Sequence, residues 1–180
     1  LEQLAFDTIC HEHLEYYSLE SLKFLLDRHN LTIVDAEMND VNGGSFRVFV
    51  RKNSATPEKF ATAPYRDVAR MRVAQMLEYE KTLNLTDPAT YRTYYQAMEK
   101  LKADTLAFVK AEKAKGKTIW GYGASTKGNT LLQWYGLDHT LIDAIAERAE
   151  MKFGHRTVGT NIPIVSEDEM RQDKPDYLLV

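Results

Sequence analysis

The sequence has little of what disulfide-bonded, membrane-spanning or nucleic-acid-binding proteins depend on. Cys10 is the single cysteine among 180 residues, so an internal disulfide and a four-cysteine zinc site are both excluded. One cysteine and no recognisable signal peptide predict a cytoplasmic protein. No apolar run approaches the roughly 20 residues that span a bilayer. The formal net charge of −3 lacks the basic surplus typical of nucleic-acid-binding proteins. We therefore expect neither a membrane nor a nucleic-acid partner.

What is present is the composition of a globular protein. Hydrophobic residues make up 44% and charged residues 27%, enough for one ordinary domain or two small ones. The chain has no initiator Met, and it ends in the strand-like run at residues 176–180. We expect a fragment of a longer protein, with part of the chemistry carried upstream.

The first half predicts a helix, a hairpin and two longer helices. Ser18, or Ser21 one turn later, is a good N-cap for leucines at helical spacing. Two strand-like runs at residues 31–37 and 45–52 flank Asn-Gly-Gly, whose glycines permit a tight hairpin turn. Helical periodicity then covers residues 57–83 and 88–115.

The second half alternates strands with helices. Strands are expected at residues 117–120, 141–147, 162–165 and 176–180. A glycine turn and a helix follow the first strand, and Ser166 with Glu169 forms a capping-box signature. This alternation predicts an α/β fold with a parallel, Rossmann-like sheet.

Three ionisable side chains stand together at His11, Glu12 and His13. The spacing is not the zinc-protease pattern, because the histidines are two residues apart instead of four. If the segment is extended, the two histidines share one face, and a histidine can remove a proton near neutral pH. The alternative, two partly buried histidines with ordinary hydrogen bonds, stays open.

A second candidate site is the run GYGASTKGNT at residues 121–130. It follows a strand and opens a helix, where backbone amides and the helix dipole favour a phosphate, and Lys127 would add a full charge. It is not a Walker A loop, because Lys127 precedes Gly128. It is not a strict GxGxxG either, because Thr126 replaces the third glycine. A tight turn without a ligand is the alternative.

A third candidate is Arg47, which follows the hairpin turn. Its guanidinium could bind a phosphate through two parallel hydrogen bonds, although an arginine on a strand is more often simply solvated.

In this order, FDTICHEHLEYYSLESLKFLL, NGGSFRVFVRK, GYGASTKGNTLL, GTNIPI and PDYLLV resemble the nucleotide-sugar C-methyltransferases over residues 4–180. The resemblance implies three parts. Residues 1–52 would end a class I S-adenosylmethionine (SAM) methyltransferase domain, residues 53–115 would be a helical connector, and residues 116–180 a Rossmann-like domain that binds the nucleotide sugar. The SAM glycine motif and a zinc-binding domain would lie upstream, with no metal bound by this chain.

The resemblance also implies residue roles. His13 ends the family's Y-H-E-H motif and would be the base, with Glu12 and His11 beside it, although Cys10 replaces the tyrosine. Removal of a proton beside a keto group would give an enolate that takes the methyl group of SAM. A dTDP- or similar nucleotide-linked keto sugar of deoxysugar biosynthesis is the expected substrate. The residues expected to bind it are Ser45, Arg47, Gly121, Tyr122, Gly123, Ala124, Lys127 and Asn129.

Residues 146–154 depart from the family pattern V-D-R-N-P-x-K-x-G. Lys152 and Gly154 match it, and the acidic residue moves to Glu147. The alternative function is a non-catalytic Rossmann-like module that binds a nucleotide, NAD or a protein. NAD would require an acidic residue about 20 residues beyond the glycines, and Asp143 and Glu147 lie near that spacing.

Overall fold

The computed structural model describes residues 4, 6, 8–41, 44–55 and 63–180. The chain divides into two compact units. The N-terminal unit comprises residues 15–94, and the C-terminal unit comprises residues 2–14 and 95–180. The division expected from the sequence, at residues 52/53 and 115/116, stays a prediction.

The N-terminal unit is built on a hairpin. Strands β1 (Leu31–Asn39) and β2 (Ser45–Lys52) pair antiparallel, with a register irregularity between Ile33 and Asp35. This confirms the predicted hairpin, whose turn residues 42–43 lie outside the described part of the chain. Helix α1 (Leu19–Asp27) begins with a capping box, in which Ser18 is the N-cap and Ser21 returns the hydrogen bond from position N3.

Helix α2 (Ala63–Thr82) holds this unit together by polar contacts at both ends. Arg72 forms an ion pair with the buried Asp35 of β1, and the hydroxyl of Tyr65 donates to the same carboxylate at 2.8 Å. The carboxylate of Glu80 accepts the amides of Leu19 and Glu20 at 2.5 and 2.9 Å. The helix expected from residue 57 is thus seen from Ala63, since residues 56–62 lie outside the described part.

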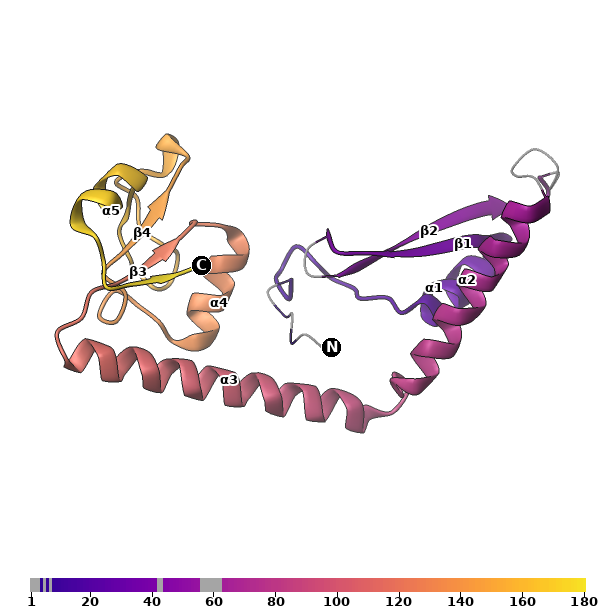
Figure 1. Cartoon of the computed structure of the whole chain (residues 1–180), viewed down its shortest axis with the longest axis horizontal. Coiled ribbons are helices and arrows are strands. Elements are labelled where there is room, and N and C mark those ends of the chain that lie inside the picture. Colours follow the sequence, from indigo (N-terminus) through magenta and orange to yellow (C-terminus); the bar gives the residue numbers. More distant parts are fainter. Residues whose placement is uncertain (1–3, 5, 7, 42–43, 56–62) are drawn as a thin grey trace. The chain divides into compact units, whose positions relative to one another are not determined.

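The C-terminal unit contains a four-stranded parallel sheet in the order β5-β4-β3-β6. Its elements are listed in chain order: α3 (Pro88–Ala114), which begins in the N-terminal unit, β3 (Ile119–Tyr122), α4 (Thr126–Tyr135), β4 (Ala144–Glu147), the 3₁₀ turn η3 (Glu150–Lys152), β5 (Ile164–Ser166), α5 (Glu167–Asp173) and β6 (Tyr177–Leu179). In Figure 1, α4 and α5 flank β3 and β4 on opposite sides, the α/β arrangement that the alternating pattern predicted.

The core of this sheet is aliphatic, and it is centred on β3 and β4, whose first three residues are buried. Val109 of α3, Ile119 of β3 and Ile142 are fully buried, and they pack with Ile145 and Ile162. A continuous apolar character is typical of buried parallel strands. Helix α5 begins with the predicted capping box of Ser166 and Glu169.

Three strand predictions shift by a few residues. The strand expected at 117–120 is found two residues later, so Gly121 and Tyr122 belong to β3 and the turn begins at Gly123. The strand expected from residue 141 begins only at Ala144, because the amides of Leu141 and Ile142 both donate to Asp138 in a turn. The strand expected at 162–165 is β5 at Ile164–Ser166.

Candidate functional site

The glycine turn lies where the sheet reverses its strand order. After β3 the chain adds β4 on one side, and β6 later adds on the other side of β3. In open α/β sheets this arrangement leaves a crevice at the carboxyl end of the central strand, where ligands bind. Residues 123–125 occupy that end of β3. The topology therefore places the predicted phosphate-binding turn at the expected ligand position.

The glycines of this turn have different roles. A Cβ on Gly121 would lie 3.2 Å from Cγ1 of Ile145, a tight contact, so the close approach of β3 and β4 favours glycine there. A Cβ on Gly128 would lie 3.2 Å from the hydroxyl of Ser125. Gly123 has a φ of 90°, and a Cβ there would meet no described atom within 4 Å. Gly121 and Gly128 serve packing, whereas the backbone at Gly123 is open to approach.

Helix α4 starts with a well-formed cap. The Ser125 hydroxyl accepts the Gly128 amide at 3.0 Å, with Ser125 in extended backbone geometry. The amides of a first helical turn have no acceptor within the helix, and they carry partial positive charge. This end of α4 therefore favours an anion placed at the turn.

Glu147, at the carboxyl end of β4, is bound to the turn. Its Oε2 accepts the amide of Ala124 at 3.0 Å and the ammonium of Lys152 at 2.8 Å. Its Oε1 accepts the amides of Arg148 and Ala149 at 2.8 and 3.1 Å. Lys152 also donates to the carbonyl oxygen of Ala124 at 3.0 Å. The Lys152 ammonium and these amides hold the pKa of Glu147 at about 2, against an opposing effect of burial.

These contacts bear on the NAD alternative. A carboxylate has about four acceptor positions, and four donors of the chain already use those of Glu147. Asp143 lies before β4, where it accepts the amide of Ile119 at 2.8 Å and the ammonium of Lys113 at 2.6 Å. Neither carboxylate is placed to bind a ribose, so the feature that would favour NAD is absent at these two positions.

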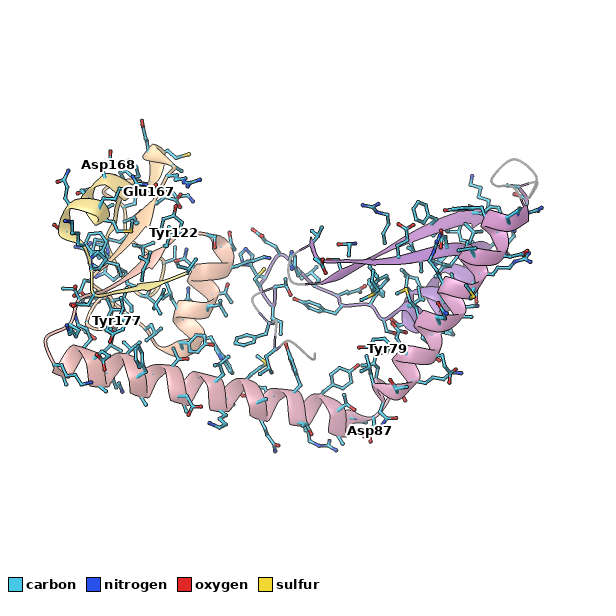
Figure 2. The ribbon with its side chains drawn as sticks, in the orientation of Figure 1. Tyr79, Asp87, Tyr122, Glu167, Asp168 and Tyr177 are labelled. Atoms are coloured by element: carbon cyan, nitrogen blue, oxygen red, sulfur yellow. The ribbon has the colours of Figure 1, made fainter. Side chains whose placement is uncertain are left out.

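Tyr122 belongs to a charged cluster at the same end of the sheet. Its hydroxyl donates to Glu167, the first residue of α5, and Figure 2 shows the two side chains next to each other. Arg148 and Arg171 also donate to Glu167, at 2.6 and 2.7 Å. The Tyr122 hydroxyl and the two guanidinium groups lower the pKa of Glu167 to about 2. Arg148 is largely exposed beside the candidate crevice.

The structure gives Asn129 a role within the protein. Its side-chain amide donates to the carbonyl of Ser125 at 2.9 Å, and its Oδ1 accepts the amide of Val158 at 3.1 Å. Gln133 donates to the carbonyl of Val158 at 3.0 Å. Asn129 thus joins the start of α4 to the loop at residues 157–160. Lys127 lies in the first turn of α4, half-buried.

The His11-Glu12-His13 segment forms turns instead of an extended strand. The amide of Cys10 donates to Thr8, and the amide of His13 donates to Cys10. The argument from strand alternation is therefore wrong, because it required an extended segment. All three side chains are exposed, and the segment belongs to the same unit as the glycine turn.

His13 has one fixed ring nitrogen. Its Nδ1 lies 2.8 Å from the carbonyl oxygen of Thr8. A carbonyl can only accept, so Nδ1 carries the proton and the lone pair of a neutral ring is on Nε2. The backbone carbonyl of Thr8 therefore sets this tautomer. In this exposed ring, Nε2 is the nitrogen that could accept a proton.

Ser45 and Arg47 lie in the N-terminal unit, on β2. The hydroxyl of Ser45 donates to the carbonyl of Val41 at 2.8 Å, which closes the hairpin turn. Arg47 is exposed and lies directly opposite Glu37 in the strand register. The structure thus groups the histidine segment with the glycine turn, and it places Ser45 and Arg47 in the other unit.

Sequence reasoning missed two parts of this site. The contacts of Glu147 and Lys152 with Ala124 had a signal, since both residues belong to the run at residues 146–154 that was compared with the family pattern. The contact of His13 with the carbonyl of Thr8 had no signal in the sequence, because every residue type has a backbone carbonyl.

Within the described part of the chain, no group of three or more His, Cys, Asp or Glu side chains is arranged to hold a metal ion. The described helices include none with the length and apolarity to cross a bilayer.

Comparisons with known proteins identify the family of this chain. A family model described as the C-methyltransferase C-terminal domain matches residues 40–180, so the chain belongs to the C-methyltransferase family. More particularly, it is similar to "C-methyltransferase NovU" from Streptomyces niveus, with 37% identity over 180 residues. All of the chain is aligned, and it spans 40% of the length of that relative.

Proposed function

We propose that this chain is the C-terminal part of a SAM-dependent enzyme that methylates a carbon beside the keto group of a nucleotide-linked deoxysugar. The observation that carries the proposal is the Nδ1–H of His13 on the Thr8 carbonyl, in a chain that belongs to the C-methyltransferase family. A base of this kind is what C-methylation at such a carbon requires, because the carbon must first lose a proton. The cytoplasm is the proposed compartment.

The step assigned to this chain is proton removal. Nε2 of His13 takes the proton from the carbon next to the keto group, and the electron pair of the broken C–H bond forms an enolate. The carbonyl of Thr8 accepts a hydrogen bond from Nδ1–H throughout, so the positive charge of the imidazolium is stabilised as it forms. General-base assistance of this kind contributes about 10²–10⁴-fold.

The second task of this chain is to hold the nucleotide. The turn at residues 123–125 lies at the switch point of the sheet and leads into α4, a position that suits the diphosphate of the proposed substrate. Lys127, in the first turn of that helix, is proposed to add a charge-assisted contact. We also keep Ser45 and Arg47 as proposed substrate contacts from the N-terminal unit.

SAM would supply the methyl group, and the carboxyl end of β4 does not fit its ribose. The carboxylate at the end of β4 is the group that would bind an adenosyl ribose on this kind of sheet. In this chain it is Glu147, whose oxygens are bound to Ala124, Arg148, Ala149 and Lys152. We therefore derive no step through SAM from these residues.

Replacement of His13 tests the proposal in the full-length protein. His13→Asn should lower kcat by about 10²–10⁴-fold, with KM for the nucleotide sugar nearly unchanged, because the base acts only in the chemical step. His139→Asn, an exposed histidine in the same unit, is the matched control. Thermal melts show whether stability changes. Wild-type turnover by His13→Asn would assign the base elsewhere, with His11 and Glu12 tested next.

A further inference from the structure

One ion pair holds both polar backbone atoms of Ala124, the residue at the centre of the glycine turn. Glu147 accepts the amide of Ala124, and Lys152 donates to its carbonyl oxygen, while the two side chains bind each other at 2.8 Å. The amide of the preceding residue, Gly123, donates to Ala146 at 2.8 Å. The peptide planes on both sides of Ala124 are thus fixed by residues at or after the end of β4.

We propose that Glu147 and Lys152 form a clamp that holds the Gly123–Ser125 turn in the conformation that binds the substrate's diphosphate. In this role Glu147 is a positioning residue and not a ligand. The proposal rests on the function proposed above, in which this turn binds the diphosphate.

The geometry argues against two other roles for the pair. A ribose ligand needs a free carboxylate oxygen, and each oxygen of Glu147 already accepts two donors. A purely structural pair would be expected to connect core elements. This pair instead reaches from β4 and η3 to an open turn, where Gly123 has a φ of 90° and free space on its Cβ side among the described atoms.

The amides of Gly123 and Ala124 are already donated to Ala146 and Glu147, so the amides proposed to bind phosphate are those at the start of α4, which the turn positions. Such amides bind phosphate only when they converge on it. A turn that has to become ordered on binding reduces affinity by the free energy of that ordering. Because the ion pair of Glu147 and Lys152 orders the turn before the ligand binds, this free energy is not lost from the affinity. The side chain of Lys152 is 40% exposed, so a direct contact with phosphate is the role that the experiment must separate from the clamp.

The test compares two probes, UDP and inorganic pyrophosphate, by titration calorimetry on the full-length protein well below its melting temperature. Glu147→Gln should weaken binding of both probes by the same factor, about tenfold, because the turn loses its order before any ribose contact matters. Lys152→Met should give the same loss, and Lys152→Arg, which keeps the charge and its donors, should restore affinity. Glu150→Gln, an exposed carboxylate in η3, is the control.

Other outcomes overturn the clamp. Loss of UDP affinity alone would make Glu147 a ribose ligand. Loss with Lys152→Met but not with Glu147→Gln would make Lys152 a direct phosphate ligand. Unchanged affinity in both variants would leave a structural pair. If the wild-type protein binds neither probe, the proposed function of the turn fails as well, which separates that failure from failure of the clamp alone.

Hydrogen exchange gives a readout that needs no ligand. In the unliganded Glu147→Gln protein, the amide of Ala124 should exchange faster than in the wild type. The single, uncharged oxygen of glutamine is a weaker acceptor and cannot serve all four donors that Glu147 binds. Equal protection of that amide in the two proteins would overturn the clamp.

Discussion

Single residues at the carboxyl end of β3 divide into those that hold the turn and those that are positioned to meet a ligand. Gly121 and Asn129 were both expected to bind substrate, yet one packs against Ile145 and the other binds Ser125 and Val158. Gly123, at the open turn, and Lys127, in the first turn of α4, keep their proposed binding role.

Lys127 gives a prediction at this scale. In the full-length enzyme, Lys127→Ala should raise KM for the nucleotide sugar with a smaller effect on kcat, because the diphosphate is present in ground state and transition state alike. Loss of one charge-assisted contact is worth about 1.5–3 kcal/mol, or roughly 10- to 100-fold in affinity. Steady-state kinetics measure the split. Lys110→Ala, on the exposed side of α3, is the control for lost charge, and a fall in kcat alone would contradict the prediction.

Elements were easier to predict from the sequence than the contacts between them. The hairpin, the parallel sheet and the capping box at Ser166 each follow from local patterns, and all three are confirmed. The start of the glycine turn could not be predicted, because pairing with Ile145 and Leu179 draws Gly121 into β3. The end of β3 is set by pairing with the neighbouring strands, which local sequence propensity does not predict.

The candidate site was predictable only in part, for the same reason. The strand–glycine–helix order indicated the turn, and the topology places it at the switch point of the sheet. The contacts of Glu147 depend on η3 bringing Lys152 back toward Ala124, which is a tertiary feature. The roles of His13, Ser45 and Arg47 toward the substrate stay predictions.

The link between α2 and β1 gives a prediction about stability. Asp35 is buried, and the hydrogen bonds from Arg72 and Tyr65 hold its pKa below the ordinary value. Asp35→Ala should destabilise the N-terminal unit by about 3 kcal/mol, since one partner of a largely buried pair is removed. Urea unfolding followed by circular dichroism measures this change. The exposed Asp67→Ala on α2 should leave the midpoint nearly unchanged, and an equal effect of both substitutions would contradict the assignment.

The clamp also predicts a pH dependence of stability in the C-terminal unit. Glu147 has a folded pKa of about 2 against an ordinary value of 4.5, so its contribution is present above pH 4.5 and is lost as the pH falls toward 2. Glu147→Gln should therefore lower the melting temperature at pH 7, and the difference from wild type should shrink by pH 3. Scanning calorimetry across this range tests the sign. A difference that grows on acidification would show that the carboxylate is not stabilised in its charged form.

At the scale of the whole molecule, the chain contains the C-terminal domain of its family. It spans 40% of the length of the relative from Streptomyces niveus. The sheet that it contributes has a turn suited to phosphate, and a carboxylate that its own backbone and Lys152 already bind. Binding of a diphosphate on such a sheet needs the glycine turn, whereas binding of an adenosyl ribose needs a free carboxylate at the end of β4. This combination favours the substrate's diphosphate over SAM as the ligand of the C-terminal unit.

The last prediction follows from that preference. The 180-residue chain should show no measurable SAM binding in titration calorimetry, because the carboxylate at the end of β4 has no acceptor position left for the ribose hydroxyls. The same preparation should bind UDP, which shows that the chain is folded and that its turn is competent. Glu147→Gln should not create SAM binding, since it loosens the turn without adding a carboxylate. Stoichiometric, tight SAM binding by the wild-type chain would contradict the prediction and would place a SAM site among these residues.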